Sequence, residues 1–275
     1  FLSKFTYGPS VEGLFVQSNL GVVTKLSILL TPQPPAFMEC ILEVPELEDL
    51  VPMVDTVGRM RRNGLISTCV SFVSFAETIF VRGKRTDFWD GDGPIPDWRL
   101  NELKSQFGEG YWIARWGLYG GKRVVKAQFE EIQDIISREL PTATLKGNLF
   151  EGEGGKLLDN KKIPMEHAAL LTGTPSLFSL PMINWTLPRD GTGKGAHGDY
   201  APIIPNSGKL ILEWVLASHT HYKAAGMEPA IDFFMHERHV VMVNMFTYNQ
   251  RDPKQTANVH QLYHNFHQES LKRGY

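Results

Sequence analysis

The sequence predicts an α+β domain in which an antiparallel or mixed sheet carries helices packed on one of its faces. Three observations predict this class. The chain has 275 residues, of which 42% are apolar, and this is enough to bury the core of one large domain or two small ones. Extended and helical patterns alternate along the chain. Most connections between them are short, as is typical of a sheet covered by helices.

The first elements follow an opening segment, residues 1–32, whose apolar and turn residues suggest strands with no earlier element to pair with. Residues 36–45 are extended, and Pro45 closes this stretch. Residues 46–64 predict a helix, because acidic residues come first, arginines come last and Gly64 is suited to end it. Apolar side chains recur there at helical spacing, at Leu47, Leu50, Val51, Val54, Val57 and Met60.

A second unit of the same kind follows. Residues 65–75 are rich in β-branched side chains and predict a strand. Residues 111–120 predict another strand, residues 122–140 a helix, and residues 142–150 a further strand. Strand, helix and strand therefore recur in the same order.

A third unit lies near the end of the chain. Residues 199–205 are extended, residues 207–226 predict a helix, and residues 230–248 predict a pair of strands. Two glycine-rich stretches between the units, residues 87–98 and 150–162, predict surface loops.

The last helix, predicted over residues 252–274, has Asp252 as its N-cap and Pro253 in its first position. Three histidines share one side of it, but no second element offers a carboxylate or thiol to complete a zinc shell: His260, His264 and His267. Residues 90–93 (DGDG) lack the further oxygen ligands of a calcium loop and predict a turn. We therefore expect no metal site, and no Ser, Cys or Lys lies in a nucleophile motif.

Charge and cysteine content narrow the function classes. The net charge of −2 gives no electrostatic reason to expect nucleic acid or an anionic membrane as a partner. No apolar run approaches the roughly 20 residues that span a bilayer. Cys40 and Cys69 both lie in apolar, strand-like runs, so a disulfide stays open, but two buried thiols are favoured. The sequence thus favours an intracellular location, in the cytoplasm or a peroxisome.

Residues 193–198 (GKGAHG) match the nucleotide fingerprint G-x-G-x-x-G. That fingerprint needs a strand before it and a helix after it. A Pro and an Asp lead into the loop, and the two prolines that follow it leave no place for a helix to begin. His197 stands between Gly195 and Gly198, where neighbouring backbone can approach a flat group closely. The residues alone leave four roles open for this imidazole: a base, a ligand, a covalent anchor, or none.

Two stretches resemble the vanillyl-alcohol oxidase and p-cresol methylhydroxylase family of flavoproteins. Residues 8–25 (GPSVEGLFVQSNLGVVTK) resemble its motif G-P-x-x-D-G-L-F-x-Q-S-N-x-G-[IV]-V-T-K, with Glu12 in place of the usual Asp. Residues 197–208 (HGDYAPIIPNSG) are similar to its segment H-x-x-F-[SA]-P-I-x-x-x-S-G. Residues 224–252 also align with family members without a gap, and the resemblance covers essentially the whole chain.

The resemblance implies a domain organisation. Residues 1–26 would be terminal strands at the C-terminal tail of an FAD-binding domain, and residues 27–275 would form the substrate-covering cap domain. The chain would then be an internal piece of a longer protein. On its own it is expected to be inactive, because most of the cofactor-binding domain would be missing.

The resemblance also implies site residues. His197 would carry FAD through a covalent bond to the 8α-methyl group, and the glycines beside it would give the isoalloxazine edge room. Backbone groups of four residues would contact FAD: Ser18, Asn19, Gly21 and Val22. Three residues would line the substrate pocket: Tyr200, Asp232 and Val243. The catalytic residues themselves are expected outside this chain.

Family members oxidise para-substituted phenols, such as vanillyl alcohol, eugenol-type alkenyl phenols or alkylphenols. A hydride passes from the benzylic carbon to flavin N5, and oxygen or an electron-acceptor protein reoxidises the flavin. The resemblance is compatible with a homo-oligomer. Two alternatives stay open: a related dehydrogenase of the 2-hydroxy-acid type with unattached FAD, and a non-catalytic α+β module.

Overall fold

The structure is a computed structural model that describes residues 11–164 and 166–275. The chain divides into two compact units, which we call unit 1 (residues 1–33) and unit 2 (residues 34–275). The first ten residues lie outside the described part, and with them the start of the opening motif and of the strands predicted there. Each unit is described by itself.

Unit 1 forms a 3-10 turn, η1 (Glu12–Phe15), and residues 11–33 contain no strand. The structure therefore does not form the strands expected over this part of the chain. A strand needs a neighbour to satisfy its backbone N–H and C=O groups, and the described part of unit 1 offers none. The assignment of residues 1–26 to an FAD-binding domain and of residues 27–275 to a cap stays a prediction.

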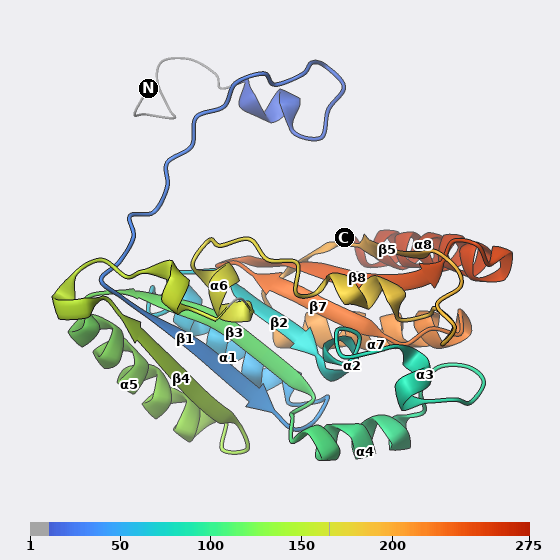
Figure 1. The fold of residues 1–275 in the computed structure, drawn as a ribbon, viewed down its shortest axis with the longest axis horizontal. Helices are drawn as coiled ribbons and strands as arrows, with labels where there is room; N and C mark the ends of the chain where they lie inside the picture. Colours follow the sequence, from blue (N-terminus) through green and yellow to red (C-terminus); the bar gives the residue numbers. More distant parts are fainter. Residues whose placement is uncertain (1–10, 165) are drawn as a thin grey trace. The chain divides into compact units, whose positions relative to one another are not determined.

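An antiparallel sheet of eight strands runs through the described part of unit 2 and confirms the α+β class (Figure 1). Its strands lie in the order β4-β1-β3-β2-β7-β8-β5, and β6 pairs with β8. The strands are β1 (Ala36–Val44), β2 (Val70–Ser74), β3 (Trp112–Gly120), β4 (Thr144–Glu151), β5 (Gly195–Tyr200), β6 (Ile203–Pro205), β7 (Ala230–Met235) and β8 (His239–Asn249).

Helices cover one face of this sheet, as predicted. They are α1 (Leu50–Arg62), α5 (Lys122–Glu139), α7 (Gly208–Ala224) and α8 (Pro253–Arg273). Figure 1 shows α1, α5 and α7 behind the strands. The main hydrophobic core lies between them and the sheet, and it includes the fully buried side chains of Trp112, Trp116, Trp214, Phe233 and Phe266.

Local sequence signals explain where these helices begin and end. The Asp252 carboxylate caps α8 by accepting hydrogen bonds from the backbone N–H groups of Lys254 (2.9 Å) and Gln255 (3.2 Å). Gly64 and Gly226, which follow α1 and α7, both have positive φ, a conformation that costs glycine little. Asp252 as N-cap is thus confirmed, and so are the stops at both glycines.

The two stretches predicted as surface loops are more ordered than expected. Short helices flank or enter the first: α2 (Phe75–Thr78), α3 (Arg85–Phe88) and α4 (Asp97–Phe107). The second contains η2 (Glu153–Gly155) and η3 (Asn160–Lys162), and α6 (His167–Leu171) and η4 (Leu180–Asn184) follow it. The first loop also contains the buried side chain of Ile95, and the second contains that of Leu158. The prediction of surface loops is therefore wrong at these two positions.

Cys40 is buried and Cys69 half-buried, and both thiols are free. The disulfide left open by the sequence is therefore not formed, and burial raises the pKa of both thiols. No helix in the described part of the chain has the length and apolar character needed to cross a bilayer.

Candidate functional site

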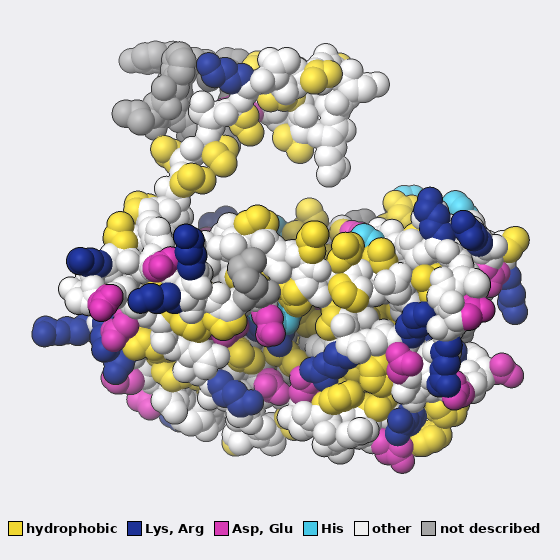
Figure 2. Space-filling view, viewed as in Figure 1, with side chains coloured by type: hydrophobic (Ala, Val, Ile, Leu, Met, Phe, Trp, Pro, Cys, Tyr) yellow, Lys and Arg dark blue, Asp and Glu magenta, His cyan; other side chains and the backbone are white. Residues whose placement is uncertain are grey.

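The face of the sheet opposite the long helices holds a cavity of about 490 Å³, which we call the sheet-face cavity. Because side chains alternate across a strand, every second residue of the central strands points to this face. Figure 2 views it and shows acidic, basic and histidine side chains lying among apolar ones. Strands β2, β3, β5, β7 and β8 form its floor, and α2, α6 and η4 supply further walls.

Three of the predicted site residues line the sheet-face cavity. They come from three adjacent strands: His197 from β5, Val243 from β8 and Asp232 from β7. Asp232 lies directly opposite Val243 in the β7–β8 register. Residues predicted from separate stretches of sequence are thus brought together in one place.

Tyr200 does not reach this cavity. Its ring faces the helices and packs against Trp214, Tyr263 and Phe266. The reason is the two-residue period of β5, which puts His197 and Asp199 on the cavity face and Tyr200 on the other. Asp199, which we did not predict, takes the place expected for Tyr200. Counting in steps of two from His197 would have identified it.

The glycines beside His197 also have a different role from the one expected. A side chain at Gly195 would collide with the backbone carbonyl oxygen of Ile183. A Cβ atom at Gly198 would lie 2.7 Å from the ring of Phe246. The missing side chains at Gly195 and Gly198 therefore allow the close approach of Ile183 and Phe246, rather than leaving room for a flavin edge.

The His197 imidazole itself is exposed and forms no hydrogen bond with the described residues. It stands beside the cavity on a strand that is fixed on one side by β8, with Thr247 as its register partner. The backbone of His197 is thus fixed by the sheet, whereas its ring nitrogen atoms have no hydrogen-bond partner among the described residues. An imidazole in this state suits a residue that forms a bond to an organic cofactor.

The four predicted FAD contacts lie together in unit 1, in the loop after η1. The Ser18 hydroxyl accepts a hydrogen bond from the backbone N–H of Leu20 (3.1 Å), and Val22 is 89% exposed. Gly21 lies against the ring of Phe15, where a Cβ atom would be 3.1 Å away. The roles of Ser18, Asn19, Gly21 and Val22 in cofactor binding stay a prediction.

Two carboxyl groups, those of Glu77 from α2 and Asp232, face each other at the cavity. Glu77 Oε2 and Asp232 Oδ1 are both buried, and neither accepts a hydrogen bond from an N–H or hydroxyl group of the described residues. Burial, then the charge of Asp232, raises the pKa of Glu77 well above its ordinary value. Burial, then the charge of Asp199, raises the pKa of Asp232 to about 7. Burial and the neighbouring negative charges therefore favour the protonated form of both carboxyl groups.

Comparisons with known proteins identify a homologue of the chain and structures of the same fold. The 4-cresol dehydrogenase (hydroxylating) flavoprotein subunit of Pseudomonas putida is 24% identical over 277 residues, covering 99% of this chain and 50% of the relative. The chain is a homologue of this flavoprotein subunit. The predicted resemblance to this family of flavoproteins is thereby confirmed over the whole chain. No family model matches the chain.

Solved structures show the same fold. Substrate-bound p-cresol methylhydroxylase matches with a TM-score of 0.83 at 21% identity, over 100% of this chain and 51% of that one. The 4-ethylphenol oxidase from Gulosibacter chungangensis matches with a TM-score of 0.84 at 21% identity and the same coverage. This chain thus spans about half the length of the relatives that it matches.

Sequence reasoning missed several polar residues of the sheet-face cavity. Glu77, Asp199, Arg115 and His167 all line it, although none was singled out. Arg115 had a visible signal, because it is a lone charge inside the otherwise apolar strand β3. Glu77 and His167 gave no such signal, since each lies on a helix of four or five residues without a clear apolar period.

The raised pKa of Asp232 predicts how the stability of the fold depends on pH. The folded-state pKa of Asp232 lies above the ordinary 3.8, so the native state holds the carboxyl proton of Asp232 more tightly than the unfolded state does. The contribution to stability is complete below about pH 4 and is lost as the pH rises through about 7.

Asp232→Asn removes this ionisation. We expect its free energy of unfolding, relative to that of the wild type, to rise by about 2–3 kcal/mol between pH 5 and pH 8. Urea unfolding at the two pH values measures the difference. A difference between variant and wild type that stays constant with pH would contradict the raised pKa of Asp232.

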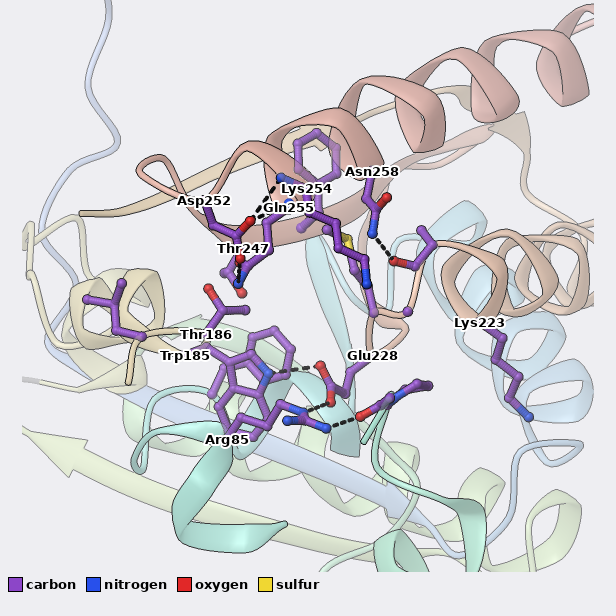
Figure 3. A pocket seen from close by; sticks show the side chains of 18 of the residues that line it. Arg85, Trp185, Thr186, Lys223, Glu228, Thr247, Asp252, Lys254, Gln255 and Asn258 are labelled. Atoms are coloured by element: carbon purple, nitrogen blue, oxygen red, sulfur yellow. Dashed lines mark hydrogen bonds and ion pairs between the residues drawn. The ribbon is translucent and has the colours of Figure 1, made fainter. Parts of the chain in front are cut away.

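A second cavity, of about 660 Å³, surrounds Glu228, and none of the predicted site residues lines it (Figure 3). Glu228 is 5% exposed and accepts hydrogen bonds from Arg85 Nε (2.9 Å), Trp185 Nε1 (3.0 Å) and the backbone N–H of Ile95 (3.2 Å). Both carboxylate oxygens therefore accept hydrogen bonds, and they link the three segments of the chain that carry Arg85, Ile95 and Trp185. We therefore interpret Glu228 as a structural residue.

Proposed function

We propose that this chain is part of an FAD-dependent oxidoreductase that oxidises para-substituted phenols, with FAD tethered to His197. The observation that supports this most strongly is the convergence of His197, Asp232 and Val243 on the sheet-face cavity. The names of the relatives, a cresol dehydrogenase flavoprotein subunit and an ethylphenol oxidase, point to the same substrate class.

The residues of the cavity fit a flavin and an aromatic substrate. The exposed imidazole of His197 is a nucleophile that can bond to the cofactor. FAD, when bound, accepts a hydride from the substrate carbon. The cavity, at about 490 Å³, lies within the usual size range of small-molecule sites.

The walls of the cavity have two functions. Apolar side chains, including those of Val243, Met245 and Met182, can pack against an aromatic ring and exclude water from it. Asp232 can accept a proton at the carboxylate oxygen that has no other hydrogen-bond donor among the described residues. Glu77 would hold the Asp232 carboxylate in place by donating its proton to the other oxygen.

The activity belongs to the whole protein, because the chain spans about half the length of its curated relative. We expect these 275 residues alone to show no turnover. Electrons would leave the full-length enzyme through oxygen or an electron-acceptor protein. The same cap could also serve a dehydrogenase with unattached FAD, or a non-catalytic module, and the following experiment separates these.

The test uses the full-length protein under anaerobic conditions. We expect 4-ethylphenol to bleach the flavin absorbance and L-lactate, a 2-hydroxy acid, to leave it unchanged. After acid precipitation the yellow colour should stay in the pellet, because the flavin is attached. Bleaching by lactate alone with a yellow supernatant would establish the 2-hydroxy-acid alternative, and no bleaching by either would establish the non-catalytic one.

A further inference from the structure

Arg115 is a largely buried cation at the floor of the sheet-face cavity. Its two neighbours in β3, Ala114 and Trp116, are fully buried on the helix side of the sheet. Because side chains alternate between the two faces of a strand, the Arg115 guanidinium points to the cavity face. In the register it lies between Ser71 of β2 and Ile41 of β1. It forms no ion pair with the described residues, and its buried Nε has no hydrogen-bond partner among them.

The acidic groups near Arg115 are engaged elsewhere. Glu109 forms an ion pair with Arg82. The Glu43 carboxylate lies 3.6 Å from Lys146 Nζ, and Glu39 accepts a hydrogen bond from Asn148 Nδ2 (3.0 Å). These carboxylates act on Arg115 only from beyond ion-pair distance. A buried guanidinium without a direct partner is unfavourable, and a bound anion would relieve this.

His167 provides a neutral donor at the same place. It lies on α6, lines the cavity with Arg115, and is fixed by edge contact with the ring of Phe178, at 4.6 Å between centroids. Burial, then the charge of Arg115, lowers the pKa of His167 to about 4. At neutral pH its ring is therefore uncharged and carries one N–H donor. A guanidinium beside such a donor suits a carboxylate.

The end of the sheet-face cavity opposite Arg115 is lined by acidic side chains. Asp199 and the Glu77–Asp232 pair lie towards β5 and β7, whereas Arg115 lies on β3. Four inter-strand steps separate β3 from β5, about 19 Å between backbones. An anionic ligand would therefore place its charged end at Arg115 and its remaining length towards His197.

We propose that Arg115 binds a carboxylate at the end of the substrate's para side chain, with His167 as a second donor. This inference rests on the proposed function, and it narrows the substrate to a 4-hydroxyphenyl alkanoate. The phenol ring then lies between Arg115 and His197, against the apolar side chains of the floor.

The test compares two phenols with the full-length, FAD-loaded enzyme. They are 3-(4-hydroxyphenyl)propanoate and 4-propylphenol, which differ mainly in the carboxylate. We expect the wild type to have the higher kcat/KM for the acid. Arg115→Met should lower kcat/KM for the acid by at least about 30-fold, mainly through KM, with a much smaller change for 4-propylphenol.

Two further variants distinguish a specific loss of carboxylate binding from a general loss of folding. Arg115→Lys keeps the charge and should recover part of the preference for the acid. Arg123→Met, an exposed arginine on α5, should leave both substrates unaffected. Equal effects of Arg115→Met on the two phenols, or no preference in the wild type, would overturn the inference.

A binding measurement separates this inference from the proposed function. Calorimetry with 3-phenylpropanoate, which has no phenol hydroxyl, should show binding that Arg115→Met weakens by about 30-fold or more. If neither phenol reduces the flavin but this binding persists, the proposed function fails and the carboxylate site stands. If flavin reduction occurs and the binding does not depend on Arg115, the carboxylate site fails alone.

Discussion

Replacing His197 with alanine in the full-length protein is expected to abolish covalent attachment of FAD. The imidazole is the exposed nucleophile beside the sheet-face cavity, and alanine offers no atom that can form the bond. An alkylated flavin tends to have a higher potential, so its loss should also lower the rate of flavin reduction by about tenfold or more. Acid precipitation reports attachment, and anaerobic stopped-flow absorbance reports the rate.

His260→Ala serves as the matched control. His260 is exposed on α8 and lines neither of the cavities described above, so flavin attachment and rate should both be unchanged. Retention of an acid-stable flavin in His197→Ala would show that another residue carries the cofactor. The folded state is checked by circular dichroism, because His197 makes no hydrogen bond in the described structure whose loss would unfold the chain.

The largest effect on stability is expected from Glu228→Ala. The variant leaves the buried Trp185 indole N–H without its acceptor and Arg85 without its ion-pair partner (Figure 3). The backbone N–H of Ile95 loses its acceptor as well. Breaking a buried ion pair from one side costs about 3–5 kcal/mol, and we expect a destabilisation of that size.

Urea unfolding measures this change, with Glu228→Gln as the control. Glutamine keeps one oxygen acceptor for the indole and fills the same space, so its loss should be clearly smaller than that of alanine. A destabilisation below about 1 kcal/mol for Glu228→Ala would show that the carboxylate does not join the three segments.

The sequence predicted the sheet and the helices that cover it, because these elements bury a strongly periodic apolar pattern. The helix predicted at residues 122–140 illustrates this, because it is formed as α5 and buries Val125, Ile132 and Ile136. Helix α4 was missed because Leu103 is its one buried residue, so the apolar period is too weak to see. Short helices such as α2 depend on tertiary contacts, which the local sequence does not encode.

The candidate site was predicted only in part. His197, Asp232 and Val243 were found because the family resemblance covers their stretches, and the structure places all three at one cavity. Tyr200 was expected to line the substrate pocket, but its ring lies on the helix face of β5, as the two-residue period of the strand would have indicated. Glu77 could not be found from sequence, because its position beside Asp232 depends on the pairing of β2 with β7.

The central claim is that flavin and phenol meet at the sheet-face cavity, and a crystal structure tests it most directly. The crystals would contain the full-length holoenzyme, soaked anaerobically with 4-ethylphenol. We predict continuous density between the His197 imidazole and the flavin, with the phenol ring beside Asp232 and Val243. A flavin bound away from His197, or a phenol bound outside this cavity, would contradict the account.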